Sequence, residues 1–369
     1  MSESGGLRVR QWVSMPGGSC DVRMGTGVID EASPLLKGAA GTPRSSALVV
    51  GSDVGEDLVE RMRRQLTDAG FSVARTGVPA GDATRTLDAV AALASSFAMG
   101  GITSDDLAVV VGDADVLSLA SYVCAQWCAG MPLVMVPTDQ TAFVEAVLTP
   151  RGIDVGARER MLSVRPAAKH VLLDVDVALA DESSEDVLMA RALMAVTAMC
   201  DSEASFSRLW DRSEDLCAGD RRVLCEQLQD TIKVRGKVLS STALALRQSL
   251  TYGESFARAL VRLAGGAVAP STARAEALRF QARLAAGEGL FALDDVLAQD
   301  ELLDRLELPT ATVSLDPDAL VAAIREERFA RTNRFLLGLP RKLGRVRLAA
   351  VSDELLAEHV AAWCASRSA

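Results

Sequence analysis

The scarcity of histidine limits the chemistry that this chain can perform. Its 369 residues include two histidines, His170 and His359. Zinc sites in proteins need three or four donors, usually His, Cys, Asp or Glu side chains in converging positions. A metal site built on two or three imidazoles is therefore nearly excluded. His170 adjoins an apolar run and is typical of a structural histidine, and His359 is expected at the surface of an amphipathic helix.

The polar residues best placed for binding follow two short apolar runs. Gly112 and Asp113 come after one run, and Thr138 and Asp139 come after the other. A turn from a strand into a helix offers backbone N–H groups to a phosphate, so Gly112, Thr138 and Asp139 are candidate cofactor-binding residues. The alternative is an ordinary capping turn, with Asp115 as the N-cap of the next helix.

Four further charged residues are candidates for binding an anion or a cofactor. Asp82 and Arg85 stand three residues apart at the start of a predicted helix, where they can pair with each other. Arg151 lies in a polar loop, and Arg247 ends a helix-like stretch. An arginine is well suited to phosphate, but a solvated surface position is the common alternative.

The elements that must position these residues fall into two domains. Over residues 1–180, short apolar runs alternate with helical spacing, which favours an α/β domain with a parallel sheet covered on both faces. Ligands bind such sheets at the carboxyl ends of the strands. The predicted strands are 47–50, 71–74, 107–111 and 132–136, and the predicted helices are 56–69, 84–99 and 115–127.

Residues 181–369 show mainly helical spacing and predict a second, mainly α-helical domain. Weaker strand signals occur at 312–315 and 346–349. The predicted helices are 185–199, 221–235, 255–263, 274–286, 319–329 and 353–365.

Composition excludes several classes of partner. The chain has 39 basic and 49 acidic residues, a net charge of −10, which disfavours binding to nucleic acid. No apolar run approaches the roughly 20 residues of a membrane span. Its seven scattered cysteines do not form a disulfide framework, so the cytoplasm is the expected location.

The order of these motifs resembles that of 3-dehydroquinate synthase and its sugar-phosphate cyclase relatives, from Ala47 to Val360. The family segment G-E-x-S-K-S is similar to residues 81–86, and its glycine-rich strand end is similar to residues 110–122. Its P-T-T segment resembles the end of 129–139. The resemblance implies a Rossmann-like dinucleotide-binding domain, then a helical domain for metal and substrate, in a homodimer.

The same resemblance implies that the metal ligands of the family are missing here. The family binds one divalent metal, normally zinc or cobalt, through a glutamate and two histidines. The segment that matches the glutamate helix, 191–196, contains neither an acid nor a lysine. Glu254 stands at the position of the first histidine, and the second falls at 270–274, where Pro270 has no side-chain donor. We therefore expect neither zinc nor cobalt.

Other family positions are kept or changed conservatively. No catalytic residue is assigned, and the nearest candidates are Glu145 in place of an aspartate, Arg151 in place of a lysine, and Glu254. Arg247 and Arg334, near a family lysine pair, are the candidate phosphate-binding residues.

We interpret the chain as a 3-dehydroquinate synthase-like pseudoenzyme that lacks metal-dependent cyclisation of a heptulosonate phosphate. Binding of a small phosphorylated ligand or a nucleotide is a further hypothesis. NAD is a candidate cofactor by resemblance alone, because Asp113 and Ala114 replace two pyrophosphate glycines of the family. The alternatives are a functional 3-dehydroquinate synthase, an NAD-dependent phosphate-eliminating lyase of the shikimate pathway, or a metal-independent relative that uses Glu254 and Glu145 as acid or base.

Overall fold

The computed structural model describes residues 7–15, 18–79, 81–148, 152–156, 158–164, 168–179 and 184–368. The chain divides into two compact units. Unit 1 consists of Met1–Ala180 and Leu228–Ser240, and unit 2 consists of Asp181–Gln227 and Ser241–Ala369. Among the described residues, no helix combines the length and apolar character that a membrane crossing requires.

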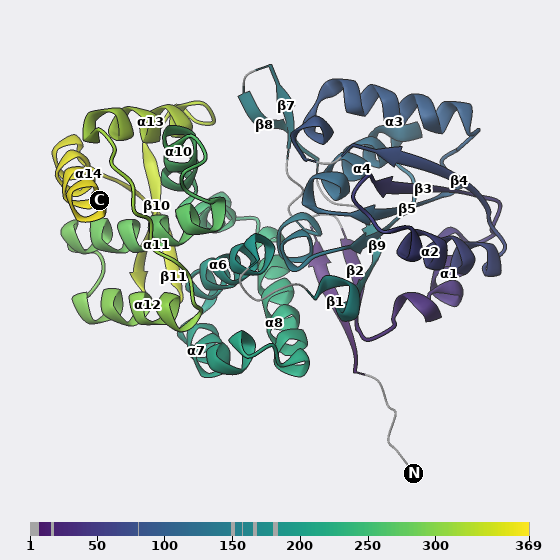
Figure 1. The fold of residues 1–369 in the computed structure, drawn as a ribbon, viewed down its shortest axis with the longest axis horizontal. Helices are drawn as coiled ribbons and strands as arrows, with labels where there is room; N and C mark the ends of the chain where they lie inside the picture. Colours follow the sequence, from purple (N-terminus) through teal and green to yellow (C-terminus); the bar gives the residue numbers. More distant parts are fainter. Residues whose placement is uncertain are drawn as a thin grey trace, which may run out of the picture. The chain divides into compact units, whose positions relative to one another are not determined.

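Unit 1 is built on a seven-stranded sheet formed by described residues, in the order β1-β2-β9-β6-β5-β3-β4 (Figure 1). The edge strand β1 pairs antiparallel with β2, and the other neighbouring pairs are parallel. This confirms the predicted α/β fold with a parallel sheet. The strands are β1 (Arg8–Met15), β2 (Gly18–Gly25), β3 (Ser45–Gly51), β4 (Ser72–Val78), β5 (Leu107–Gly112), β6 (Leu133–Pro137) and β9 (Ala168–Asp174).

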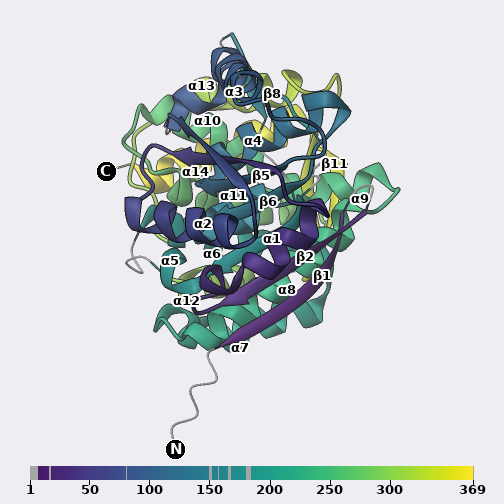
Figure 2. The ribbon, with the colours of Figure 1, turned by 90° about the vertical axis from the view of Figure 1, so that its right-hand side faces the viewer.

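Helices cover both faces of this sheet, which is why its central strands are apolar throughout. In Figure 2, α3 (Leu87–Met99) and α4 (Ala114–Gln126) lie above β5 and β6, and α1 (Ser33–Ala40) and α2 (Glu56–Asp68) lie below them. The face under α1 and α2 forms one apolar cluster with alternate residues of the strands. Every residue of β5 and β6 is buried.

Shorter elements complete unit 1. The second half of helix α8 (Arg221–Leu239) packs on β1, and its Gly236 leaves no space for a side chain, because a Cβ there would lie 2.5 Å from Val13 Cγ1. The short elements are the 3-10 helices η1 (Ile29–Glu31), η2 (Gly81–Arg85) and η3 (Trp127–Ala129), the π-helical turn η4 (Ala142–Ala146), the hairpin of β7 (Ile153–Val155) with β8 (Arg158–Leu162), and α5 (Val175–Ala178).

Unit 2 is mainly helical, as predicted, and α11 is its central helix. α11 packs against α6, α10, α12, α14 and β10, and most of its side chains are buried. A two-stranded hairpin, β10 (Leu336–Lys342) with β11 (Arg345–Ala350), accompanies the helices. The helices are α6 (Glu185–Asp201), α7 (Glu203–Cys217), the first part of α8 up to Gln227, α9 (Leu244–Arg247) followed by η5 (Gln248–Thr251), α10 (Glu254–Ala264), α11 (Pro270–Gly287), α12 (Leu293–Arg305), α13 (Pro317–Phe329) and α14 (Asp353–Arg367).

Two predicted elements are wrong in detail. The segment 312–315 is not a strand, because the Val313 N–H donates to the Arg367 carbonyl oxygen at 2.9 Å and holds the segment on α14. The helix predicted from residue 84 begins at Leu87, since Thr86 is its N-cap and accepts from the Ala89 N–H at 3.1 Å.

Candidate functional site

Strand ends β5 and β6 bring Gly112 and Thr138 together at the carboxyl edge of the unit 1 sheet. The Thr138 N–H donates to the Gly112 carbonyl oxygen at 3.1 Å. A Cβ at Gly112 would lie 2.7 Å from Val116 Cγ1, so the close packing of α4 on β5 requires a glycine here. Two of the predicted cofactor-binding residues are thus neighbours in the place where an α/β sheet binds ligands.

Asp113 occupies the N-terminus of α4 with its own carboxylate. Its Oδ1 accepts from the backbone N–H groups of Asp115 at 2.9 Å and Val116 at 2.8 Å. Asp113, and not Asp115 as predicted, is therefore the N-cap, because it directly precedes the first helical residue. Burial raises the pKa of Asp113, and the charges of Asp115 and Asp53 raise it further.

These residues do not fit a dinucleotide pyrophosphate. A phosphate at a helix N-terminus binds free backbone N–H groups in a region of positive potential. Here the Asp113 side chain already takes two of those groups and adds a negative charge.

Arg85 and Asp82 pair as predicted, but Arg85 also binds two other carboxylates. Its Nη2 lies 2.8 Å from Asp82 Oδ1, its Nη1 lies 3.0 Å from Asp115 Oδ2, and its Nε lies 3.2 Å from Asp154 Oδ2. The Arg85 side chain is 11% exposed. Three acids surround one guanidinium, so we assign Arg85 the role of holding the β7–β8 hairpin to α4 rather than that of binding phosphate.

The remaining unit 1 candidates have local partners. Asp139 Oδ1 accepts from the Ala142 N–H at 2.6 Å and caps η4. Glu145, on η4, lies 3.8 Å from Arg160 Nη1. Arg151 lies outside the described residues.

In unit 2, Glu254 is the first residue of α10, and its position is fixed by the turn before it. Gly253 has a φ of +84°, a left-handed conformation that favours glycine, and its N–H donates to Gln281 Oε1 of α11 at 2.6 Å. Arg258 Nη2 donates to Glu254 Oε1 at 2.6 Å. The two side chains are 26% and 17% exposed, so this pair is largely buried.

Arg328 of α13 extends this pair into a cluster. Arg328 is 9% exposed, and its buried Nε has no hydrogen-bond partner. Burial lowers the pKa of Arg328, and the charge of Glu254 raises it. Nη1 of Arg258 is likewise buried without a hydrogen-bond partner. We call Glu254, Arg258 and Arg328 the guanidinium cluster; it carries two positive charges and one negative charge.

The other positions that the family resemblance gives to metal ligands also have different partners. In the segment of α6 that matches the glutamate helix, Arg191 is 1% exposed and donates from Nη1 to the Leu306 carbonyl oxygen at 3.5 Å. Next to Pro270, the Ser271 N–H and hydroxyl each donate to the Glu185 carboxylate at 2.6 Å.

These residues do not fit a divalent metal ion. Within the described ranges, no group of three or more His, Cys, Asp or Glu side chains is arranged to hold one. The net positive charge of the guanidinium cluster would repel a cation.

Three of the buried cysteines do not supply thiolates for a site either. Burial raises the pKa of Cys20 and of Cys124 to about 12, and that of Cys225 to about 11. Since the thiolate is the nucleophile and the metal ligand, these three cysteines stay inert near neutral pH.

Neither of the two predicted phosphate-binding arginines, Arg247 and Arg334, is a member of the guanidinium cluster. Arg247, at the end of α9, donates from Nη1 to the Ser241 carbonyl oxygen at 2.6 Å. Arg334 is exposed in the turn between α13 and β10.

Sequence reasoning missed Arg258 and Arg328. The spacing of Glu254 and Arg258, one helical turn apart, was a signal that they could pair. Arg328 gave no comparable signal, because its burial depends on how α13 packs against α10.

Comparison with known proteins agrees with the fold. Residues 75–185 match the family model described as 3-dehydroquinate synthase N-terminal. The 3-dehydroquinate synthase of Saccharopolyspora erythraea is 28% identical over 322 residues, covering 85% of this chain and 83% of the relative. That of Geotalea uraniireducens is 25% identical over 317 residues, covering 83% and 86%.

Two solved structures share the architecture. A 2-deoxy-scyllo-inosose synthase complexed with carbaglucose-6-phosphate, NAD+ and Co2+ has a TM-score of 0.82 at 16% identity, covering 95% of this chain and 99% of the other. The 2-epi-5-epi-valiolone synthase of Streptomyces hygroscopicus, with NAD+ and Zn2+ bound, has a TM-score of 0.81 at 16% identity, covering 96% and 99%. Taken together, the family model matched over residues 75–185, the relatives and the shared fold show that this chain is similar to 3-dehydroquinate synthases.

Proposed function

We propose that this protein binds a small phosphorylated ligand at the guanidinium cluster without a metal ion, and does not catalyse metal-dependent cyclisation. The observation that carries the proposal is Arg328, a buried arginine whose Nε has no hydrogen-bond partner and whose facing acid, Glu254, is already paired with Arg258. Buried cations are normally paired with an anion. A phosphate would give an acceptor to Arg328 Nε and Arg258 Nη1.

The chemistry of the ligand follows from the donors in the cluster. Guanidinium groups bind phosphate and carboxylate through parallel N–H···O hydrogen bonds. A related cyclase, the 2-deoxy-scyllo-inosose synthase, was solved with carbaglucose-6-phosphate, a phosphorylated cyclic polyol. We therefore propose a sugar phosphate or a close analogue as the ligand class.

The reaction that the family resemblance implies relies on a metal to polarise a hydroxyl and a carbonyl. This polarisation contributes several kcal/mol to catalysis. A guanidinium group donates hydrogen bonds but does not coordinate oxygen as a Lewis acid. Glu254 has its carboxylate on Arg258, which further limits its use as a general base. These points support the loss of cyclisation in this chain.

A direct assay tests the proposed loss of cyclisation. Purified protein supplied with heptulosonate phosphate, NAD and either Zn2+ or Co2+ is expected to release no phosphate and to form no dehydroquinate. The 3-dehydroquinate synthase of Geotalea uraniireducens, assayed in parallel, is the positive control. Metal-dependent turnover by this chain would contradict the proposal and favour the alternative of a functional synthase.

The homodimer, the absence of nucleic-acid and membrane partners, and the cytoplasmic location stay predictions from the sequence. NAD binding has only the resemblance in its favour, and Asp113 argues against it.

A further inference from the structure

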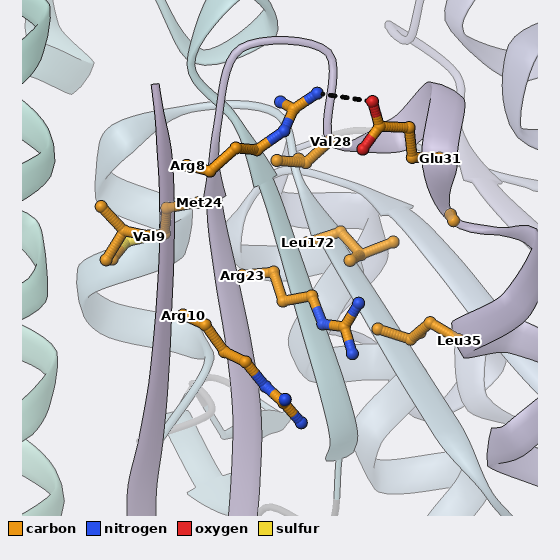
Figure 3. A pocket seen from close by; sticks show the side chains of 10 residues that line it. Arg8, Val9, Arg10, Arg23, Met24, Val28, Glu31, Leu35 and Leu172 are labelled. Carbon is orange, nitrogen blue, oxygen red and sulfur yellow. Dashed lines mark hydrogen bonds and ion pairs between the residues drawn. The ribbon is translucent and has the colours of Figure 1, made fainter. Parts of the chain in front are cut away.

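A pocket of about 270 Å³ opens on unit 1 beside the β1–β2 hairpin (Figure 3). Its apolar side is lined by Val28, Leu35 and Leu172, which belong to the apolar cluster under α1 and α2. Its polar side lies along β1 and β2. This side carries three arginines, Arg8, Arg10 and Arg23.

Strand pairing places two of these arginines side by side. Arg10 of β1 stands directly opposite Arg23 of β2, and Leu172 of β9 is the next residue across the sheet. Figure 3 shows the Arg10 and Arg23 side chains extending toward the side where Leu35 lies. Like charges directly opposite each other destabilise an antiparallel pair unless a counter-charge is near.

One buried carboxylate serves both arginines. Asp21, with a side chain 1% exposed, accepts from Arg10 Nε at 2.9 Å and Arg10 Nη2 at 3.0 Å. Its Oδ2 also accepts from Arg23 Nη2 at 3.2 Å and Nε at 3.3 Å. Two guanidinium groups thus share one acid, which leaves one positive charge on this side of the pocket.

The remaining charged residues of the lining, Arg8 and Glu31, cancel each other. Arg8 Nη2 lies 3.0 Å from Glu31 Oε1, which forms a neutral pair. His170, beside Asp21, has a pKa lowered chiefly by burial, which disfavours its positively charged form. The lining residues together with Asp21 therefore combine an apolar wall with a net charge of one positive unit. Asp30, which also interacts with Arg8, is paired with Arg61.

We propose that this pocket binds a small amphipathic carboxylate, with its carboxylate on Arg23 and its apolar part against Leu35 and Leu172. A planar carboxylate matches the hydrogen-bonding edge of a guanidinium group. One negative charge balances the excess, which favours a monoanion over a dianionic phosphate ester. The volume lies just below the range of roughly 300–1,000 Å³ for drug-sized ligands, so a single ring or a short chain is the fitting size.

This proposal is independent of the proposed function. Every residue that lines the pocket belongs to unit 1, whereas the guanidinium cluster belongs to unit 2. The failure of one proposal therefore leaves the other untouched.

Titration of the full chain with benzoate, followed by calorimetry or amide chemical shifts, tests the pocket. We expect saturable binding that weakens at least about tenfold in Arg23→Met. Arg23→Met is expected to fold, because Arg10 still neutralises Asp21 through two hydrogen bonds; its thermal melt checks this. Arg63→Met is the matched control, since Arg63 is exposed on α2 and pairs only locally with Glu60 at 2.7 Å.

Three further probes separate the chemistry. Benzamide lacks the charge, acetate lacks the apolar part, and phenyl phosphate carries the ring with a second charge. We expect each to bind more weakly than benzoate. The proposal would be overturned if wild-type protein shows no saturable binding of benzoate, if Arg23→Met binds it as tightly as wild type, or if benzamide or phenyl phosphate binds equally well.

Discussion

Arg328→Met is expected to make the protein more stable and, at the same time, to weaken its binding of phosphate. The buried guanidinium of Arg328 has lost much of its hydration, and the acid that acts on it, Glu254, is shared with Arg258. Methionine has a similar length and no charge to desolvate, so we expect a gain of about 1–2 kcal/mol in the free energy of unfolding. Affinity for inorganic phosphate or glucose 6-phosphate is expected to fall at least about tenfold.

Urea denaturation in phosphate-free buffer and calorimetric titration measure these two effects. Arg262→Met is the matched control: Arg262 is an exposed α10 arginine that lies 2.9 Å from Glu326, and we expect changes below about 0.5 kcal/mol. If Arg328 has a structural role instead, Arg328→Met would lower the free energy of unfolding. Destabilisation by Arg328→Met together with unchanged phosphate affinity would contradict the proposed site.

Glu254→Gln is expected to have the opposite effects: lower stability and tighter binding of phosphate. Removing the carboxylate leaves Arg258 and Arg328 without their acid, and the pair is largely buried. We expect a loss of about 1–2 kcal/mol in phosphate-free buffer, less than for a fully buried pair because the side chains are partly exposed. We also expect phosphate to bind roughly tenfold more tightly, because it no longer competes with a fixed negative charge.

Added phosphate should therefore restore much of the stability that Glu254→Gln loses, since a ligand that binds only the folded state stabilises it. Thermal melts across a phosphate series measure this rescue. Glu326→Gln, which changes an exposed acid that pairs with Arg262 in the same unit, is expected to show neither the loss nor the rescue. A Glu254→Gln protein that is destabilised and insensitive to phosphate would argue for a purely structural ion pair.

The central strands could be predicted because burial on both faces makes them continuous apolar runs. β5 and β6 are the clearest cases, with every residue buried. The β1–β2 hairpin was not predicted. Arg8 and Arg10 alternate with less exposed residues along β1, and a strand with such charges looks like a loop until its partner is known. Asp21 stabilises that strand pair from β2, a contact that no local pattern reveals.

In the candidate site, too, some features could be predicted from the sequence and others could not. Gly112, Thr138 and the pair Asp82 and Arg85 could be placed from the sequence, because strand ends and short spacings determine their neighbours. The roles assigned to them change once partners from elsewhere in the chain are known. Arg85 is held by Asp154 of a hairpin about 70 residues later in the sequence.

Arg328 is the clearest example of a residue whose role could not be predicted from the sequence. Its helix, α13, follows Glu254 by more than 60 residues, and its burial depends on the packing of α13 against α10. The sequence indicated which histidines were missing from the family pattern. It did not indicate that a buried arginine would lie near the position of one of them.

Metal content tests the central proposal most directly. The full chain is dialysed to equilibrium against Zn2+ or Co2+, passed through a desalting column and analysed for bound metal, with the 2-deoxy-scyllo-inosose synthase treated in parallel. We expect metal far below one ion per chain in this protein, because two arginines and one paired glutamate stand in the cluster. One tightly bound ion per chain that disappears in Glu254→Gln would contradict the proposal.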